Sequence, residues 1–371
     1  MAIKHGANLF ELSKELGIKK SEILDFSSNI NPFGASNKAK EAVIKNIDMV
    51  SIYPDPEYIE LKKSISNYCA SDSEHIILGS GATELISSFI SITNPNKALL
   101  ISPAYSEYER ELKKINCNIV KYFSKKEDGF KINIDKLIEE SIEGTYDLII
   151  ICNPNNPTGF AFTKEEIEKL LKNFKGNVMV DETYVEFTDK SKYSSSQLVN
   201  EYNNLFVIRG TSKFFSTPGI RLGYGLISNE DIRNKILEKL DLWNINILAE
   251  IMGTVMFKDF DYIESTVKHM TDEREYLNKE LSSIDGIKVY ESKGNFILCE
   301  IEKENLNADI LYDSLLKEGI IIRNCSSFEG LNNKFFRVCV LSPSKELQFL
   351  IIIPSFKSES YSISAFKFSF S

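Results

Sequence analysis

Apolar runs of strand length alternate with amphipathic stretches through the first two thirds of the chain. The runs predict strands near residues 98–101, 148–152, 178–180, 206–208 and 223–227. Stretches with helical periodicity, such as 164–173, lie between them. This alternation is typical of an α/β fold whose mostly parallel sheet carries helices on both faces. Ligands of such sheets bind at the carboxyl ends of the strands, so we expect a functional site at that edge.

The pattern changes from about residue 243. A long helical region through Leu281 precedes strands at 287–290 and 295–301, a helix at 308–317, and strands at 320–323 and 335–340. This order predicts a second, smaller α+β domain, and a length of 371 residues also exceeds one typical core. We therefore divide the chain into an N-terminal arm (1–44), a large domain (45–242), a small domain (243–346) and a tail (347–371).

The carboxyl terminus fits neither pattern. The segment from Leu347 to Ile353 is almost wholly apolar, and Pro354 follows it. The Ser- and Phe-rich residues that continue to Ser371 show neither a helical nor an alternating period. Two interpretations stay open: a frameshift or truncated closing helix, and a genuine variant that packs on the small domain.

Composition narrows the class of protein. A formal charge of -9 argues against nucleic acid as a partner, because phosphate backbones require a basic face. The six cysteines are scattered without paired short spacings, which predicts reduced thiols in a cytoplasmic protein. No His/Cys cluster has metal-ligand spacing, so no metal is expected. No apolar run reaches the ~18 residues of a membrane span, and the start lacks a secretory segment.

The segment from Thr211 to Tyr224 carries the main candidate chemistry. Lys213 stands at a strand-to-loop junction behind two hydroxyl residues, and Arg221 follows eight positions later beside a Pro-Gly turn. Such a lysine can form an imine with an aldehyde while the arginine and the hydroxyls hold a phosphate. Pyridoxal phosphate carries both groups. An ordinary surface lysine is the alternative interpretation of this segment alone.

Two further segments offer partners for such a cofactor. Asp181 ends the short apolar run 177–180, and a buried carboxylate keeps a pyridine nitrogen protonated. Tyr184, three residues later, and Asn156, in a segment rich in turn formers, could each donate a hydrogen bond to the phenolic oxygen.

A glycine-rich turn supplies a candidate phosphate site. Gly79-Ser80-Gly81-Ala82-Thr83-Glu84 follows the apolar run 76–78 and opens a helix over 83–92, where backbone amides can bind phosphate. Glu84 stands where the third glycine of a dinucleotide fingerprint would be, so nicotinamide binding is rejected.

These motifs together resemble fold-type I pyridoxal-phosphate enzymes of the class I/II aminotransferase superfamily, over about residues 5–342. Within it the chain is similar to the group of threonine-phosphate decarboxylase and histidinol-phosphate aminotransferase. The resemblance implies a large domain with a mostly parallel seven-stranded sheet, a smaller α+β domain, and a homodimer with shared active sites.

The resemblance also implies roles for single residues. Lys213, Asp181 and Tyr184 would be catalytic: Lys213 binds the cofactor covalently, Asp181 meets the pyridine nitrogen, and Tyr184 meets the phenolic oxygen together with Asn156. The phosphate would be held by Arg221, Ser212 and the amides of Gly81, Ala82 and Thr83. Tyr105 would stack on the ring, its alternative being an ordinary core tyrosine, and Tyr53 would reach a phosphate across the dimer interface. Gly210 replaces a hydroxyl residue that many relatives have, and Thr211 is the candidate to compensate.

Two arginines suggest a doubly anionic substrate. Arg337 matches the family's substrate-anion arginine and Arg323 lies on a neighbouring predicted strand, and guanidinium forks suit carboxylate and phosphate. The His5-Gly6 start and the segment 24–32 are similar to threonine-phosphate decarboxylase, whereas histidinol-phosphate aminotransferases usually lack that start. The implied substrate shell is His5, Gly6, Asn29, Asn156, Arg323 and Arg337. A solvated terminus is the alternative for His5.

The resulting hypothesis is decarboxylation of O-phospho-L-threonine, which would supply the aminopropanol linker of cobalamin. The alternative is an aminotransferase of the histidinol-phosphate type. Both outcomes use the same residues and differ in which bond of the substrate α carbon stands perpendicular to the ring. A cofactor-binding regulator and a degenerate structural relative are hypotheses of other classes.

Overall fold

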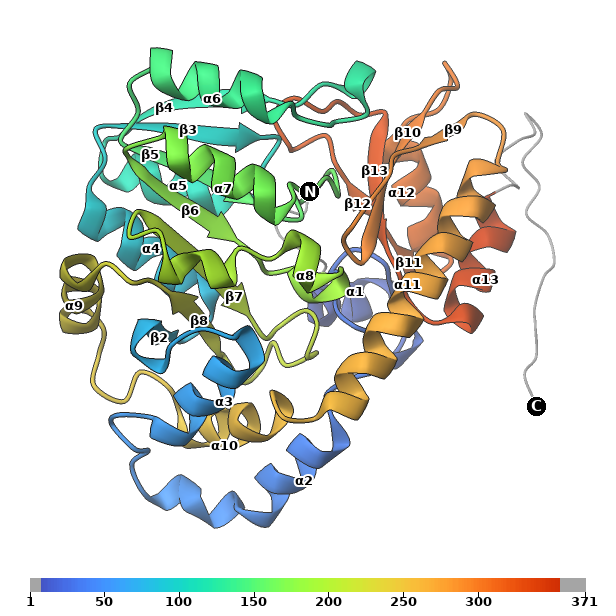
Figure 1. The fold of residues 1–371 in the computed structure, drawn as a ribbon. Coiled ribbons are helices and arrows are strands. Elements are labelled where there is room, and N and C mark those ends of the chain that lie inside the picture. Colours follow the sequence, from blue (N-terminus) through green and yellow to red (C-terminus); the bar gives the residue numbers. More distant parts are fainter. Residues whose placement is uncertain (1–7, 354–371) are drawn as a thin grey trace.

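The computed structural model describes residues 8–353, and a seven-stranded sheet forms its centre (Figure 1). Its strands are, in spatial order, β2 (Ile76–Gly79), β8 (Gly223–Leu226), β7 (Leu205–Gly210), β6 (Asn177–Asp181), β5 (Leu148–Cys152), β3 (Lys97–Ser102) and β4 (Asn118–Phe123). β8 runs antiparallel to β2 and β7, and the other four pairings are parallel. The expectation of a mostly parallel seven-stranded sheet is confirmed.

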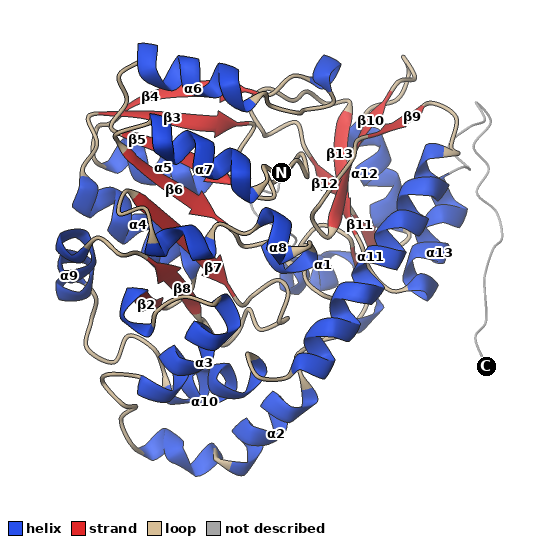
Figure 2. Ribbon diagram, viewed as in Figure 1, coloured by secondary structure: helices blue, strands red, loops and turns tan. Residues whose placement is uncertain are grey.

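Helices cover both faces of this sheet because its inner strands are apolar on both sides (Figure 2). Along β5, Leu148 and Ile150 pack in one cluster, and Ile149 and Ile151 pack in the other. The first cluster includes residues of α4 (Ala82–Thr93), α5 (Ser106–Lys114) and α9 (Glu230–Lys239), and the second includes residues of α3 (Ile59–Cys69), α6 (Ile134–Glu143) and α7 (Lys164–Asn173).

A smaller antiparallel sheet stands beside the large one (Figure 1). Its order is β12 (Arg323–Asn324), β13 (Phe335–Cys339), β10 (Phe296–Ile301) and β9 (Ile287–Val289). Its helices are α11 (Phe260–Ser282), α12 (Ala308–Lys317) and α13 (Pro343–Ile352). The N-terminal segment, with α1 (Leu9–Leu16), joins this part through a parallel pair of β1 (Leu24–Asp25) and β11 (Ile320–Ile321).

The helical region expected from residue 243 to 281 is divided in two. α10 (Ile247–Met256) ends before α11 begins, and the turn between them carries Asp259. The Asp259 carboxylate accepts a hydrogen bond from Ser36 Oγ at 2.5 Å and pairs with Lys38 at 2.8 Å. The break therefore turns a buried acid toward α2 (Asn37–Lys45) of the N-terminal segment.

The apolar segment that begins at Leu347 continues helix α13, so the expected division after residue 346 falls inside a helix. Phe349 is fully buried and its ring centroid lies 4.8 Å from that of Phe26. This packing favours the second interpretation for residues 347–353, a variant that packs on the small sheet. Residues 354–371 lie outside the described part of the chain.

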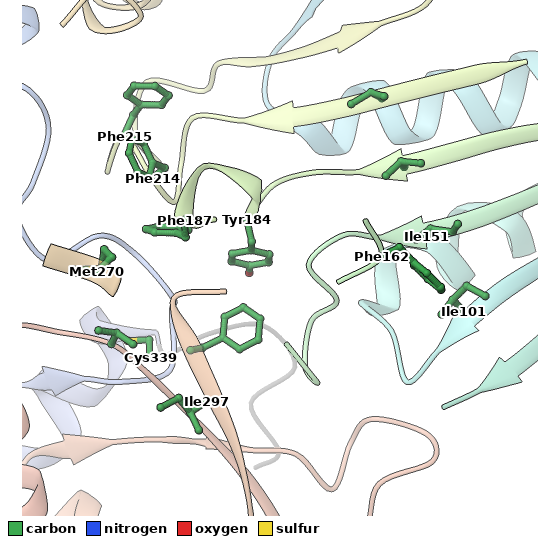
Figure 3. Packing of buried hydrophobic residues seen from close by; sticks show 14 of the residues in the cluster. Ile101, Ile151, Phe162, Tyr184, Phe187, Phe214, Phe215, Met270, Ile297 and Cys339 are labelled. Carbon is green, nitrogen blue, oxygen red and sulfur yellow. The ribbon is translucent and has the colours of Figure 1, made fainter. Parts of the chain in front are cut away.

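One hydrophobic cluster extends from the large sheet to the small one (Figure 3). Ile151 of β5 and Ile297 of β10 both belong to it, and the Tyr184 ring lies between them. The two parts are thus held in one packed arrangement around the loops that follow β5, β6 and β7. Within residues 8–353, no helix is long and apolar enough to span a bilayer.

Candidate active site

A cavity of about 440 Å³ opens at the carboxyl ends of β5, β6 and β7. The predicted site residues that line it are Ala82, Thr83, Tyr105, Asn156, Asp181, Tyr184, Ser212, Lys213, Arg221, Arg323 and Arg337. They come from separate loops of the large sheet and from two strands of the small one. The fold therefore brings together most residues that the sequence singled out.

Lys213 follows β7 and its amine is turned inward. Lys213 Nζ donates a hydrogen bond of 2.6 Å to the carbonyl of Ser28. Burial first, and then the positive charge of Arg337, lower the pKa of the Lys213 ammonium to about 8. A larger share of this amine is therefore neutral, and nucleophilic, near neutral pH than for an ordinary lysine.

Asp181 ends β6 and its carboxylate is held by three donors. Thr183 donates to Oδ1 from its backbone N at 2.9 Å and from its hydroxyl at 2.5 Å. Tyr108 donates to Oδ2 from its hydroxyl at 2.7 Å. Burial raises the pKa of Asp181, and these hydrogen bonds oppose that rise. Sequence reasoning missed Tyr108, whose one signal is its position three residues after Tyr105.

The turn between β2 and α4 forms a cradle with Arg221. Gly81 has a φ of 93°, and a Cβ on it would lie 2.4 Å from an Nη atom of Arg221. Arg221 itself has a φ of 60° and donates to the carbonyl of Ser80 at 3.4 Å. The guanidinium is thereby held at the amino end of α4, where backbone amides also attract anions.

The position of Gly210 has room for a side chain. A Cβ there would lie 3.4 Å from the Cβ of Ala82 and 4.0 Å from Thr183 Oγ1. The Thr211 hydroxyl is fully buried, donates to the Leu222 carbonyl at 2.9 Å and is absent from the cavity lining. Thr211 therefore does not compensate for Gly210, and Thr183 is the hydroxyl residue that lines this wall.

Arg337 reaches from β13 across the cavity to the large sheet. It donates to Asn156 Oδ1 and, at 2.7 Å, to the carbonyl of Ser27. Its buried Nε has no hydrogen-bond partner among the described residues. An ionised carboxylate is the kind of ligand that would satisfy such a donor.

Arg323 lies directly opposite Arg337 in the β12–β13 pair. It donates to Ser327 Oγ at 2.9 Å, and its guanidinium carbon lies 5.3 Å from the centre of the Phe328 ring. Burial, followed by the charge of Arg337, lowers the pKa of Arg323. Two adjacent buried cations favour a ligand with more than one negative charge.

Tyr184 lines the cavity, whereas its neighbour Asn29 is buried and absent from the cavity lining. Asn29 Nδ2 donates to the Tyr184 hydroxyl at 3.3 Å, and the Tyr184 ring stands edge-on to Phe296 with centroids 5.0 Å apart. Burial raises the pKa of Tyr184, so this phenol stays protonated. Tyr105 lines the cavity, and burial raises its pKa to about 12.

Tyr53 does not line the cavity of its own subunit. Its side chain is 74% exposed and its ring stacks on that of Trp243, with centroids 4.3 Å apart. The predicted substrate residues His5 and Gly6 lie outside the described residues.

The residues present fit pyridoxal phosphate. A buried amine with a lowered pKa, a buried carboxylate and a cradle of amides with a guanidinium match the aldehyde, the ring nitrogen and the phosphate of this cofactor in kind. A Cβ on Gly81 would lie 2.4 Å from an Nη atom of Arg221, so the guanidinium packs directly against the backbone of this turn.

The fold and this site are those of a pyridoxal-phosphate-dependent enzyme. Sequence comparison identifies the family. Residues 21–351 match the family model for aminotransferase class I and II, and the chain belongs to that family.

Three similar proteins represent its relatives. The chain is 40% identical to a Caldanaerobacter subterraneus protein named "Putative threonine-phosphate decarboxylase", over 91% of this chain and 89% of that protein. It is 33% identical to a bifunctional adenosylcobalamin biosynthesis protein of Leptospira interrogans, over 92% of this chain and 40% of that protein. The crystal structure of histidinol-phosphate aminotransferase from Clostridium acetobutylicum is 37% identical, with a TM-score of 0.84, and the match covers 90% of this chain and 99% of that one.

Proposed function

We propose that this protein is a pyridoxal-phosphate-dependent decarboxylase of a phosphorylated amino acid, with O-phospho-L-threonine as substrate and aminopropanol phosphate as product. The observation that supports a phosphorylated amino acid as substrate is that Arg323 and Arg337 face the same cavity as Lys213, and it is common to the decarboxylase and the aminotransferase. Two guanidinium groups suit a substrate that bears both a carboxylate and a phosphate. The 40% identity to a protein named "Putative threonine-phosphate decarboxylase" supports the decarboxylase. Its product, aminopropanol phosphate, would supply the linker of cobalamin.

The cofactor would be held by residues at three points of the cavity. Lys213 would bind the aldehyde, and Asp181 would meet the ring nitrogen. The phosphate would be held by Arg221, Ser212 and the amides of Gly81, Ala82 and Thr83. Tyr105 covers the ring, and Tyr184 with Asn156 meets the phenolic oxygen. When bound, pyridoxal phosphate supplies an electron sink for the charge that develops on the substrate α carbon.

The side chains of this protein orient the substrate and move its proton. Arg337 is fixed by Asn156 and by the Ser27 carbonyl, so an anion bound to its free edge takes one orientation. We assign the carboxylate to this arginine and the phosphate to Arg323. Lys213 Nζ then delivers the proton that the α carbon receives after carbon dioxide leaves.

An aminotransferase of the histidinol-phosphate type is the second candidate. The similarity to the Clostridium acetobutylicum structure favours it, because that protein is 37% identical over 90% of this chain. In that reaction the proton of the α carbon, rather than the carboxylate, would be removed, with Lys213 Nζ as the acceptor.

The deciding experiment supplies phosphothreonine to the purified protein with pyridoxal phosphate. We expect carbon dioxide and aminopropanol phosphate in equal amounts, both lost in Lys213→Ala. Conversion of 2-oxoglutarate to glutamate without carbon dioxide, with histidinol phosphate as amino donor, would replace the decarboxylase by the aminotransferase.

A homodimer with shared active sites is part of the same proposal. Exposed apolar side chains gather around α2, the turn 47–51 and the segment that leads to α10, and they include Ile44, Val50, Ile52, Ile59 and Leu242. Covering such a group in a second copy removes apolar surface from water. Tyr53 lies among them and would reach the cofactor phosphate of the partner. A monomer in light scattering with full activity would contradict this role.

A cytoplasmic location is proposed on the chemistry of the thiols. All six cysteines are unpaired, and five of them are buried. Unpaired buried thiols are typical of a reducing compartment. Recovery of the native protein from an oxidising compartment of the cell would contradict this location.

A further inference from the structure

Tyr108 places a polar group among apolar side chains in the wall of the cavity. The side chain is 1% exposed and packs with Ile86, Phe89 and Ile150 in the cluster on the α4–α5 face of the sheet. A buried hydroxyl is costly unless it forms a hydrogen bond. The Tyr108 hydroxyl forms one, to Asp181 Oδ2 at 2.7 Å.

The two oxygens of Asp181 are used unequally. Oδ1 accepts two hydrogen bonds, both from Thr183, whereas Oδ2 accepts the one from Tyr108. An ionised carboxylate has about four acceptor sites, so Oδ2 keeps capacity for one further donor. Asp181 also lines the cavity, where that donor would come from a ligand.

The phenol is a donor that keeps its proton. Burial, and then the charge of Asp181, raise the pKa of Tyr108 well above its usual value. The neighbouring Cys152 thiol is neutral as well, since burial raises its pKa to about 12. Tyr105 and Tyr184 also face Asp181, and burial raises the pKa of both. The Tyr108 hydroxyl therefore keeps the proton with which it bonds Oδ2.

We infer that Tyr108 is a positioning residue whose hydrogen bond to Oδ2 keeps Asp181 ionised where this carboxylate meets the ring nitrogen of the cofactor. The inference rests on the proposed cofactor, and it adds Tyr108 of α5 to the residues named for it. Without this hydrogen bond, Asp181 retains two donors on Oδ1 and the full effect of burial. Its carboxyl group then takes up a proton at a higher pH.

The test compares pyridoxal phosphate binding to apo-protein in wild type and Tyr108→Phe between pH 5.5 and 8.5, measured by quenching of Trp243 fluorescence. Lys213 and the cofactor phosphate titrate in both proteins. The quantity of interest is therefore the dissociation constant of the variant divided by that of wild type at each pH. We expect this ratio to be about 10 to 100 at pH 5.5, because a hydrogen bond to a charged group is lost, and to approach 1 at pH 8.5.

The matched control is Tyr146→Phe, which removes a phenol that bonds Glu140 at 2.5 Å far from the cavity lining. Its ratio should stay at 1 throughout. A ratio for Tyr108→Phe that is 1, or raised equally at every pH, would overturn the inference. If wild-type apo-protein binds no pyridoxal phosphate at any pH, the proposed cofactor itself fails.

A second variant covers the case in which Tyr108→Phe does not fold. Tyr108→His restores an N–H donor on a smaller ring, and cooperative thermal unfolding verifies that it folds. We expect a pH profile closer to wild type than that of Tyr108→Leu, a variant without a donor. Identical profiles for the histidine and leucine variants would contradict the inference.

Discussion

Arg323 and Arg337 are register partners across the antiparallel strands β12 and β13. Directly opposite residues of such a pair point to the same face of the sheet, and both side chains are more than nine-tenths buried in the wall of one cavity. Burying two cations side by side is unfavourable without anions. We therefore expect the small sheet to bind a ligand with two negative groups.

Replacing Arg337 by lysine tests this arrangement. A lysine keeps the charge but loses the planar fork that contacts Asn156 and the Ser27 carbonyl together. We expect kcat/KM for phosphothreonine to fall about 10- to 100-fold in a carbon dioxide assay. Arg110→Lys, a substitution on the surface of α5, serves as control and should leave the value unchanged. Equal values for both variants would contradict the assignment.

The amine of Lys213 should react at unusually low pH. Its neutral form is the reactive one, and its pKa is lowered to about 8, so labelling of apo-protein by acetic anhydride should rise with a midpoint near pH 8. In Arg337→Met the neighbouring charge is gone and the midpoint should move upward. Peptide mapping of acetylated Lys213 across pH measures both curves. A midpoint above pH 10 in wild type would refute the burial of this amine.

Gly81 should tolerate no side chain. In Gly81→Ala the new Cβ would clash with Arg221 and sit at a positive φ, which displaces the guanidinium from the α4 terminus. We expect weaker binding of pyridoxal phosphate, by about tenfold or more, in equilibrium dialysis. Gly219→Ala is the control, because a Cβ there meets nothing within 4 Å. Equal affinities of the two variants would show that the cradle lies elsewhere.

Gly210 offers the opposite case, a glycine whose replacement adds a contact. Gly210→Ser places a hydroxyl beside Ala82 and Thr183 without a close clash. We expect slower loss of pyridoxal phosphate on dilution than in wild type, since a further donor faces the phosphate. Gly210→Ala adds the Cβ alone and should release the cofactor as wild type does. Faster loss in the serine variant would contradict the available space.

Arg209 should matter for stability. Its guanidinium is buried with Glu182, 2.8 Å away, and with Glu186, 3.6 Å away. Arg209→Met leaves both carboxylates in the interior without their guanidinium partner, and we expect a loss of about 3–5 kcal/mol in the free energy of unfolding. Urea denaturation measures it. Lys268→Met, which breaks an exposed pair with Asp272, should not move the midpoint.

The sequence correctly predicted those helices and strands whose pattern of apolar and polar residues agrees with their burial in the folded protein. The run 148–152 is apolar on both faces and forms β5 at those residues, and α7 begins at a Thr163–Glu166 capping box. Strand β4 was missed because it lies at the sheet edge, and its residues are only partly covered, so no continuous apolar run marks it.

The site was predictable where a motif carries its own geometry. The chain around Lys213 and the Gly81 turn define local structure, so their place in the cavity follows from the sequence. Tyr108 was missed because its role depends on a hydrogen bond to a residue 73 positions later. Thr211 was the candidate to compensate for Gly210, but its hydroxyl bonds the Leu222 carbonyl instead. The sequence could not show this, because only the folded loop brings that carbonyl to Thr211.

The N-terminal segment has a consequence for how the protein is made. The Phe26 carbonyl accepts a hydrogen bond from the backbone N–H of Cys339, and the Ser27 carbonyl accepts one from the guanidinium of Arg337, 310 positions away. Ser27 is therefore synthesised 310 residues before the arginine that it bonds. Pairings of such long sequence separation form slowly. During translation the large sheet can assemble before β13 is made, so the binding pocket gains the wall formed by β13 later, and a chaperone would find the unpaired segment exposed until then.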